Sequence, residues 1–268
     1  MTTSFNYNNT RISYTDIGSG KLVFLLHGFG EDAGIWQLQK EFLQPHYRLI
    51  IPDLPGSGDS DLLAKDNITI DDYADVIYAL YQSLQLSDNQ QISILGHSMG
   101  GYISLAFAKK YAAIVKPVGL IHSTAFADSK EKKQVRLRGI EIMAEYGAFA
   151  FLKNTIPNLF AENFKQQFPK VVESLIEKGN QFTVSSLQQY YISMMNREDK
   201  TILLKSLNIP VLFIIGTEDV AVPLQDVLQQ VHLPYIAQIK ILEDVGHMGM
   251  LEATDIANTA VLEFLNNF

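Results

Sequence analysis

One stretch constrains the fold of this chain more than any other: residues 91–110, which read QISILGHSMGGYISLAFAKK. An alternating apolar run around Ser93 leads without a spacer into Gly96-His97-Ser98-Met99-Gly100. The residues that follow have the apolar spacing of a helix. The pattern predicts a strand, a tight turn and a helix, with a serine at the turn.

The glycines around Ser98 fit a turn that presents the serine hydroxyl. A serine there takes up a strained backbone conformation, which is tolerated only if the residues two before and two after carry almost no side chain. Gly96 and Gly100 meet that requirement. The helix that follows directs its free N–H groups toward Ser98, where they would stabilise an oxyanion. This context is that of a nucleophile elbow. The alternative is a glycine-rich turn with an ordinary exposed serine.

Further apolar runs predict the rest of a sheet. Alternating runs at 4–17, with Asn8-Asn9 between them, predict an antiparallel hairpin at a sheet edge. Continuous apolar runs then alternate with loops and helical patterns. This order is typical of an α/β fold with a mostly parallel central sheet flanked by helices, whose ligands collect at the carboxyl ends of the strands. Strands are predicted at 22–26, 47–51, 92–95, 118–121, 210–215 and 236–242, and helices at 68–84 and 251–268.

Residues 124–207 break this rhythm. They contain several helical patterns rich in Phe, Tyr and Met, one of which begins with a basic cluster at 130–138. We interpret them as an inserted helical cap, or lid, whose aromatic and Met side chains would wall an apolar pocket. The alternative is that these side chains pack in the insertion's own core. The expected domains are a core formed by 1–123 and 208–268 and a cap formed by 124–207.

Two loops after predicted strands carry residues suited to acid–base chemistry. Asp219 follows a buried strand inside a turn, and the turn fixes its position, so we rank it above Glu218 and Asp226 as the carboxylate that orients a histidine. His247 lies on a loop beside glycines, which suits a mobile general base. His27, at another strand end, is expected to hydrogen bond within its own loop.

The composition limits the possible partners. The net charge is −8 and the pI is near 5.2, so an overall basic surface for nucleic acid or anionic membrane is missing. The chain has no Cys, which excludes disulfides, thiolate zinc sites and cysteine nucleophiles. We find neither a signal-peptide pattern nor a run of about 18 apolar residues. We therefore expect a cytoplasmic protein without membrane or nucleic-acid partners. The sequence does not determine its oligomeric state.

These motifs together resemble the α/β-hydrolase superfamily over nearly the whole chain. Ser98, Asp219 and His247 match the chain order of the family's catalytic triad. Where the family often has His, this chain has Ser57, and residues 124–207 match no subgroup. The matching segments are HGFG at His27, DLPGSGDS at Asp53, GHSMGG at Ser98, GTEDVAVP at Asp219 and VGHMGMLE at His247.

The resemblance implies a serine hydrolase of the carboxylesterase type, acting on a small-molecule ester without a metal or organic cofactor. His247 would take the Ser98 proton during attack on an ester carbonyl, while Asp219 holds the imidazole. The N–H groups of Phe29 and Met99 would bind the oxyanion. The side chains expected to line the substrate pocket are Phe126, Phe149, Phe160, Met194, Val220 and Met248.

The same triad would serve other reactions. A lactonase, amidase, carbon–carbon bond hydrolase, lyase or perhydrolase would use it, and a ligand receptor would retain it without turnover. Serine at the elbow argues against haloalkane dehalogenases and epoxide hydrolases, which carry Asp there. Lipases that act at oil interfaces usually need an exposed apolar lid or secretion. Arg136 and Arg138, in the basic cluster, would matter if the substrate is anionic.

Overall fold

The computed structural model describes residues 2–87 and 90–268. Its sheet begins with the predicted hairpin, in which β1 (Thr2–Tyr7) pairs antiparallel with β2 (Thr10–Ile17). Asn8 and Asn9 turn the chain with φ angles of 47° and 65°, a left-handed conformation that Asn tolerates. β1 lies at an edge of the sheet, as predicted.

The described residues form one eight-stranded sheet in the order β1-β2-β4-β3-β5-β6-β7-β8. The pairs from β4 through β8 are parallel, whereas β2 runs antiparallel to β4. The mostly parallel α/β sheet is therefore confirmed. Because the strands are parallel, their carboxyl ends share one edge of the sheet. The remaining strands are β3 (Leu22–Leu26), β4 (Arg48–Pro52), β5 (Ile92–His97), β6 (Val115–Ile121), β7 (Val211–Gly216) and β8 (Ala237–Leu242).

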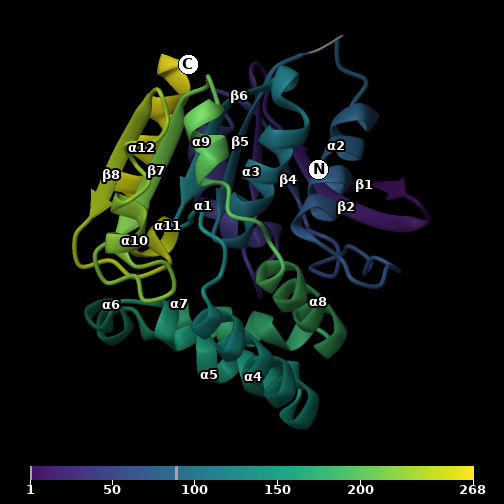
Figure 1. Cartoon of the computed structure of the whole chain (residues 1–268), viewed down its shortest axis with the longest axis vertical. Coiled ribbons are helices and arrows are strands. Elements are labelled where there is room, and N and C mark those ends of the chain that lie inside the picture. Colours follow the sequence, from purple (N-terminus) through teal and green to yellow (C-terminus); the bar gives the residue numbers. More distant parts are fainter. Residues whose placement is uncertain (1, 88–89) are drawn as a thin grey trace.

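Helices flank both faces of this sheet (Figure 1). α2 packs beside α3, while α1 and α11 pack beside α12. Thr69 and Asp72 form a capping box that starts α2. The flanking helices are α1 (Gln37–Leu43), α2 (Ile70–Ser83), α3 (Met99–Lys110), α10 (Leu224–Leu228), α11 (Gly249–Glu252) and α12 (Thr254–Asn267), with short 3₁₀ helices η1 (Ala33–Trp36) and η2 (Ala112–Ile114).

Two helix predictions differ from the structure. The sequence pattern did not indicate α1, a helix of seven residues after the loop that follows β3. The single closing helix predicted at 251–268 is instead two helices that meet at Ala253, which has a φ of −134°. The chain turns there because Glu252 at the end of α11 bonds back to the loop before it, through the N–H groups of Gly246 and Met248.

The segment between β6 and β7, residues 122–210, is helical, and we call it the inserted segment. Figure 1 shows α4–α8 gathered at one end of the sheet, with α9 level with the strands. Among residues 2–87 and 90–268, no helix is both long and apolar enough to cross a membrane. The helices are α4 (Lys130–Tyr146), α5 (Ala148–Thr155), η3 (Ile156–Leu159), α6 (Glu162–Gln167), α7 (Pro169–Lys178), η4 (Gly179–Gln181), α8 (Val184–Met195) and α9 (Thr201–Ser206).

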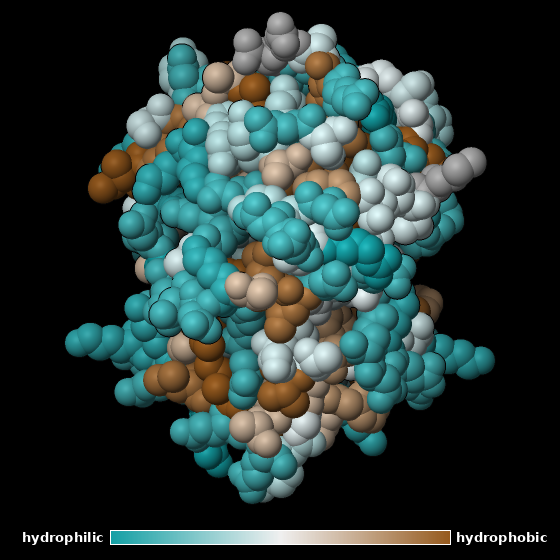
Figure 2. Space-filling view, turned by 90° about the vertical axis from the view of Figure 1, so that its right-hand side faces the viewer, coloured by the Kyte–Doolittle hydropathy of each residue, from teal (hydrophilic) through white to brown (hydrophobic). Residues whose placement is uncertain are grey.

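The outer surface of the inserted segment carries scattered hydrophobic side chains. Val135 and Leu137 on α4 are exposed, as are Tyr146 and Phe168. Figure 2 shows a mostly hydrophilic face with separate hydrophobic patches, both on the lower lobe and at the waist above it.

Candidate active site

Ser98 occupies the turn between β5 and α3, with φ 49° and ψ −114°. Such a conformation costs a non-glycine residue about 1–3 kcal/mol. A Cβ at Gly96 would lie 2.1 Å from the carbonyl carbon of Gly100, and a Cβ at Gly100 would lie 2.2 Å from the carbonyl oxygen of Leu26. Both positions therefore require glycine. The turn holds Ser98 at the carboxyl edge of the sheet and at the N-terminus of α3.

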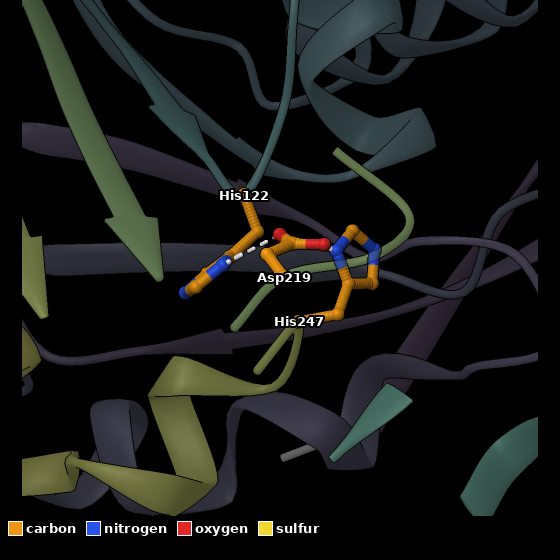
Figure 3. Close-up of side chains that lie close together, drawn as sticks. All are labelled: His122, Asp219 and His247. Atoms are coloured by element: carbon orange, nitrogen blue, oxygen red, sulfur yellow. Dashed lines mark hydrogen bonds and ion pairs between the residues drawn. The ribbon is translucent and has the colours of Figure 1, made fainter. Parts of the chain in front are cut away.

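Asp219 accepts hydrogen bonds from two histidines, whose rings flank its carboxylate (Figure 3). Its Oδ2 lies 2.8 Å from Nδ1 of His247 and 3.0 Å from Nδ1 of His122. Its Oδ1 accepts from the backbone N–H groups of Ala221 at 2.9 Å and Val222 at 2.8 Å. The loops after β6, β7 and β8 thus bring one carboxylate and two imidazoles together at the carboxyl edge of the sheet.

Of the three candidate carboxylates, it is Asp219, not Glu218 or Asp226, that bonds to His247. Burial alone would raise the pKa of Asp219, but the charge of His247 and the hydrogen bonds from both histidines hold that pKa far below its usual value. Burial lowers the pKa of His122 to about 4 despite the bond to Asp219. At neutral pH, Asp219 is therefore ionised, and His122 is neutral with its proton on Nδ1.

By distance alone, His122, Asp219 and His247 could hold a metal ion, because their ligand atoms all lie within 4.8 Å of one another. Each histidine donates from Nδ1 to the same Asp219 oxygen, so each Nδ1 carries a proton. A nitrogen that binds metal must be free of its proton. The hydrogen-bond pattern therefore fits a carboxylate that fixes two histidine tautomers better than it fits a metal centre.

A second buried acid–histidine pair lies beside the first. His97 Nδ1 lies 3.0 Å from Glu31 Oε2, and His97 Nε2 donates to the backbone oxygen of His247 at 2.9 Å. The backbone oxygen can only accept, so Nε2 carries a proton, and the ring is charged when ionised Glu31 also accepts a proton from Nδ1. Glu31 Oε2 also accepts the Gly28 N–H at 2.7 Å. The pair thereby links the loop after β3 to the loop that carries His247.

The pKa values of this pair shift as an ion pair requires. Burial alone would raise the pKa of Glu31, but the charge and hydrogen bond of His97, with the Gly28 N–H, outweigh it and lower that pKa. Burial would lower the pKa of His97, but Glu31 and the His247 carbonyl outweigh it and raise that pKa. The pair therefore stabilises the fold fully between about pH 4.3 and 6.5, the ordinary pKa values of the two side chains.

Outside this window the stabilisation is lost. It falls as acid titrates Glu31 through its lowered pKa, and as base titrates His97 through its raised pKa. We predict that Glu31→Gln lowers the free energy of unfolding by about 2 kcal/mol at pH 5.5 and by clearly less at pH 9. Urea unfolding at both pH values measures this, with Glu173→Gln, an exposed site on α7, as the control. A loss of equal size at both pH values would contradict the ion pair.

Ser98 and His247 open into one cavity of about 120 Å³. Within the described part of the chain, the Ser98 hydroxyl has no hydrogen-bond partner, and hydrogen bonds at catalytic sites often tighten only when substrate binds. A larger depression of about 300 Å³ lies between α1 and α7, but its lining has no histidine or carboxylate to activate a nucleophile. Besides Ser98 and His247, the lining of the small cavity includes Phe29, Glu31, Tyr102, Arg136, Tyr191 and Met194.

Of the six side chains expected to line the pocket, the structure brings Met194 to this cavity. Phe160 instead stacks on Phe164 with ring centroids 5.5 Å apart, Met248 is fully buried, and Val220 is 70% exposed. Composition predicts an apolar wall but not which face of each short helix or turn meets the cavity. Residues adjacent to the expected ones, such as Leu159 beside Phe160, line the cavity instead. The five expected residues outside the lining are Phe126, Phe149, Phe160, Val220 and Met248.

The two backbone groups expected to bind an oxyanion lie near Ser98. Met99 is the first residue of α3, and Phe29 lines the cavity. In the described residues neither N–H donates a hydrogen bond, so both remain available. The Phe29 ring stacks on Tyr191 of the inserted segment, with centroids 4.4 Å apart. This contact holds the loop after β3 against α8.

The inserted segment also holds the loop that carries His247. The His247 N–H donates to the carbonyl oxygen of Leu159 at 2.6 Å. The Glu252 carboxylate accepts N–H groups from both sides of this contact, at 2.8 Å from Ala161 and at 3.0 Å from Met248. Burial raises the pKa of Glu252 in spite of these bonds. The segment around η3 and the histidine loop are therefore hydrogen bonded together.

His27 has the structural role expected of it. Its Nδ1 bonds to the Gly28 carbonyl at 2.8 Å, and its Nε2 accepts the Leu54 N–H at 2.9 Å and contacts Ser57 Oγ at 2.8 Å. Glu31 and His97, like His122, are polar residues of the site that sequence reasoning did not assign. The available signal was their position, a histidine beside Ser98 and an acid just after the HGFG turn.

Comparisons with known proteins identify proteins that share this fold. A family model described as the α/β-hydrolase fold matches residues 21–137. Lipase 3 of Moraxella sp. (strain TA144) is 29% identical over 252 residues, which cover 90% of this chain and 76% of the lipase. A thermophilic esterase from Thermogutta terrifontis, solved with malate bound, superimposes with a TM-score of 0.92 at 28% identity and covers 100% of this chain and 98% of its own.

A more distant structure supports the fold alone. The enol-lactonase from Burkholderia xenovorans LB400 matches with a TM-score of 0.90 at 22% identity, covering 98% of this chain and 100% of its own. The strand order, the elbow at Ser98 and these likenesses agree with one another. The chain has the α/β-hydrolase fold.

Proposed function

We propose that this hydrolase cleaves small carboxylic esters through an acyl-enzyme on Ser98. The observation that carries the proposal is the hydrogen bond from His247 Nδ1 to the ionised Asp219, behind the cavity that Ser98 and His247 line. That bond leaves His247 Nε2 free to accept a proton. The esterase and lipase relatives support a hydrolase of this kind.

In the first half-reaction, Ser98 Oγ forms a bond to the ester carbonyl carbon while its proton passes to His247 Nε2. The N–H groups of Phe29 and Met99 bind the resulting oxyanion. When the carbon–oxygen bond to the alcohol breaks, the alcohol takes the proton from His247, and an acyl group remains on Ser98. Water then attacks the acyl group, His247 takes the water proton and returns it to Ser98, and the carboxylic acid leaves.

We also propose that residues 124–207 act as a cap over this site. Tyr191 and Met194 line the cavity from α8, and Leu159 holds the backbone of the histidine loop. A cavity of about 120 Å³ is small beside the usual 300–1,000 Å³ of ligand pockets, so it favours short acyl chains.

The test is hydrolysis of p-nitrophenyl esters from acetate to dodecanoate. We expect multiple turnover, with the highest kcat/KM at two to four acyl carbons and a steady decline for longer chains. A maximum at long chains would contradict the small pocket and favour a lipase. A single burst without turnover would favour a receptor that retains the triad.

A further inference from the structure

A partly buried arginine lines the cavity beside Ser98. Arg136, on α4 of the inserted segment, lines the cavity with Ser98 and His247, and its side chain is 19% exposed. Arginine is always ionised, and a buried charge is costly unless it is fully paired. The net charge around Arg136 therefore determines whether this end of the cavity attracts an anionic group of a ligand.

Arg136 shares its carboxylate partner with a second arginine. Asp128, whose side chain is completely buried, accepts from Arg136 Nε at 2.7 Å through Oδ2 and from Arg197 Nη1 at 2.8 Å through Oδ1. Two guanidinium groups against one carboxylate leave one net positive charge. Arg197 is further held by the carbonyl oxygens of Phe126 and Met194, so it is fixed away from the substrate.

The other charges at the cavity do not cancel this one. Glu31 lines the cavity, but it is paired with the charged His97. Asp219 stands behind His247 and is not part of the lining. Arg136 is the only Lys or Arg among the described lining residues. A guanidinium has five N–H donors. One of those on Arg136 donates to Asp128 and one interacts with the Tyr191 side chain, so others are left for a ligand.

We propose that Arg136 binds a carboxylate of the substrate, so that the preferred substrates are short esters that carry a second, ionised carboxyl group, such as half-esters of dicarboxylic acids. A guanidinium matches a carboxylate with two parallel N–H donors. The small cavity places that carboxylate a few bonds from the carbonyl that Ser98 attacks. The inference deepens the proposed esterase function and rests on it for turnover.

The test compares two esters of matched shape, monomethyl succinate and methyl 4-oxopentanoate, in which a neutral acetyl group replaces the carboxylate. We expect wild type to prefer the succinate ester. Arg136→Gln should lower the ratio of kcat/KM for the succinate ester to kcat/KM for the neutral ester by about tenfold or more, mainly through the KM of the succinate ester. Arg136→Lys should keep part of the preference. Arg138→Gln, an exposed site on the same helix, is the matched control and should keep all of it.

Several results would overturn the assignment. Equal use of the two esters by wild type would show that the site has no preference for a carboxylate. Equal losses on both esters in a folded Arg136→Gln would show that Arg136 has a structural role alone. Succinate binding by calorimetry separates this proposal from the proposed function. Binding that Arg136→Gln abolishes supports the carboxylate site even if neither ester is hydrolysed, and absence of binding to wild type contradicts it.

Discussion

Replacement of Ser98 by alanine is expected to lower ester turnover by about a thousandfold or more while the protein stays folded. The change removes the atom that forms the acyl bond. It removes little else, because the Ser98 side chain makes no helix-capping hydrogen bond and alanine is no more strained than serine at a φ of 49°. Initial rates with a p-nitrophenyl ester and a thermal unfolding curve measure both parts of the prediction.

The matched control is Ser104→Ala on the same helix. Ser104 is buried, and its hydroxyl only bonds to the carbonyl oxygen of Gly100 one turn earlier. We expect this variant to keep most of the activity. A folded Ser98→Ala protein that retains turnover would show that another group is the nucleophile.

Asp219→Asn is expected to have the second large effect, a loss of about 10⁴ in kcat. Asp219 Oδ1 accepts two backbone N–H groups, from Ala221 and Val222, so the amide oxygen of asparagine must take that position. The amide NH₂ then faces His247 Nδ1 and can only donate. His247 is forced to carry its proton on Nε2, where it can no longer accept the proton of Ser98.

Asp226→Asn separates this mechanism from a general loss of charge. Asp226 lies on α10, close to the same turn, and is 3.8 Å from Lys132 Nζ. We expect its kcat to stay within about twofold of wild type, as for most surface substitutions. If Asp226→Asn were the inactive variant and Asp219→Asn the active one, the carboxylate assignment would be wrong. Because Asp219 also accepts from His122, the profile of kcat against pH should be recorded for both variants.

The fold could be predicted largely from local patterns. Continuous apolar runs such as Leu22–Leu26 indicate strands buried on both faces, and Asn8-Asn9 supplies the φ values of a tight hairpin. The elbow could be predicted because its glycines are required by backbone contacts within three residues of Ser98 and with the neighbouring strand. These features depend on residues close in sequence or on regular strand pairing.

The remaining features depend on contacts between distant residues. Glu31 and His97 are 66 positions apart, and His122 and Asp219 are 97 apart, so no local pattern reveals either pair. The cavity lining likewise depends on which face of each inserted helix turns inward, and α4 and α8 show only weak apolar asymmetry in their sequences. The turn after β7 is equally hard to predict, because Val220 is exposed while Ala221 beside it lines the cavity.

Covalent labelling tests the central claim most directly. A fluorophosphonate transfers its phosphonyl group to an activated serine oxygen and releases fluoride, which mimics acylation. Incubation with active protein, followed by intact-mass measurement and peptide mapping, should show one phosphonyl group per chain on the peptide that contains Ser98, with loss of turnover in proportion to labelling. Ser98→Ala should take up none. Full activity without a label on Ser98, or equal labelling of the alanine variant, would contradict a serine hydrolase that works through Ser98.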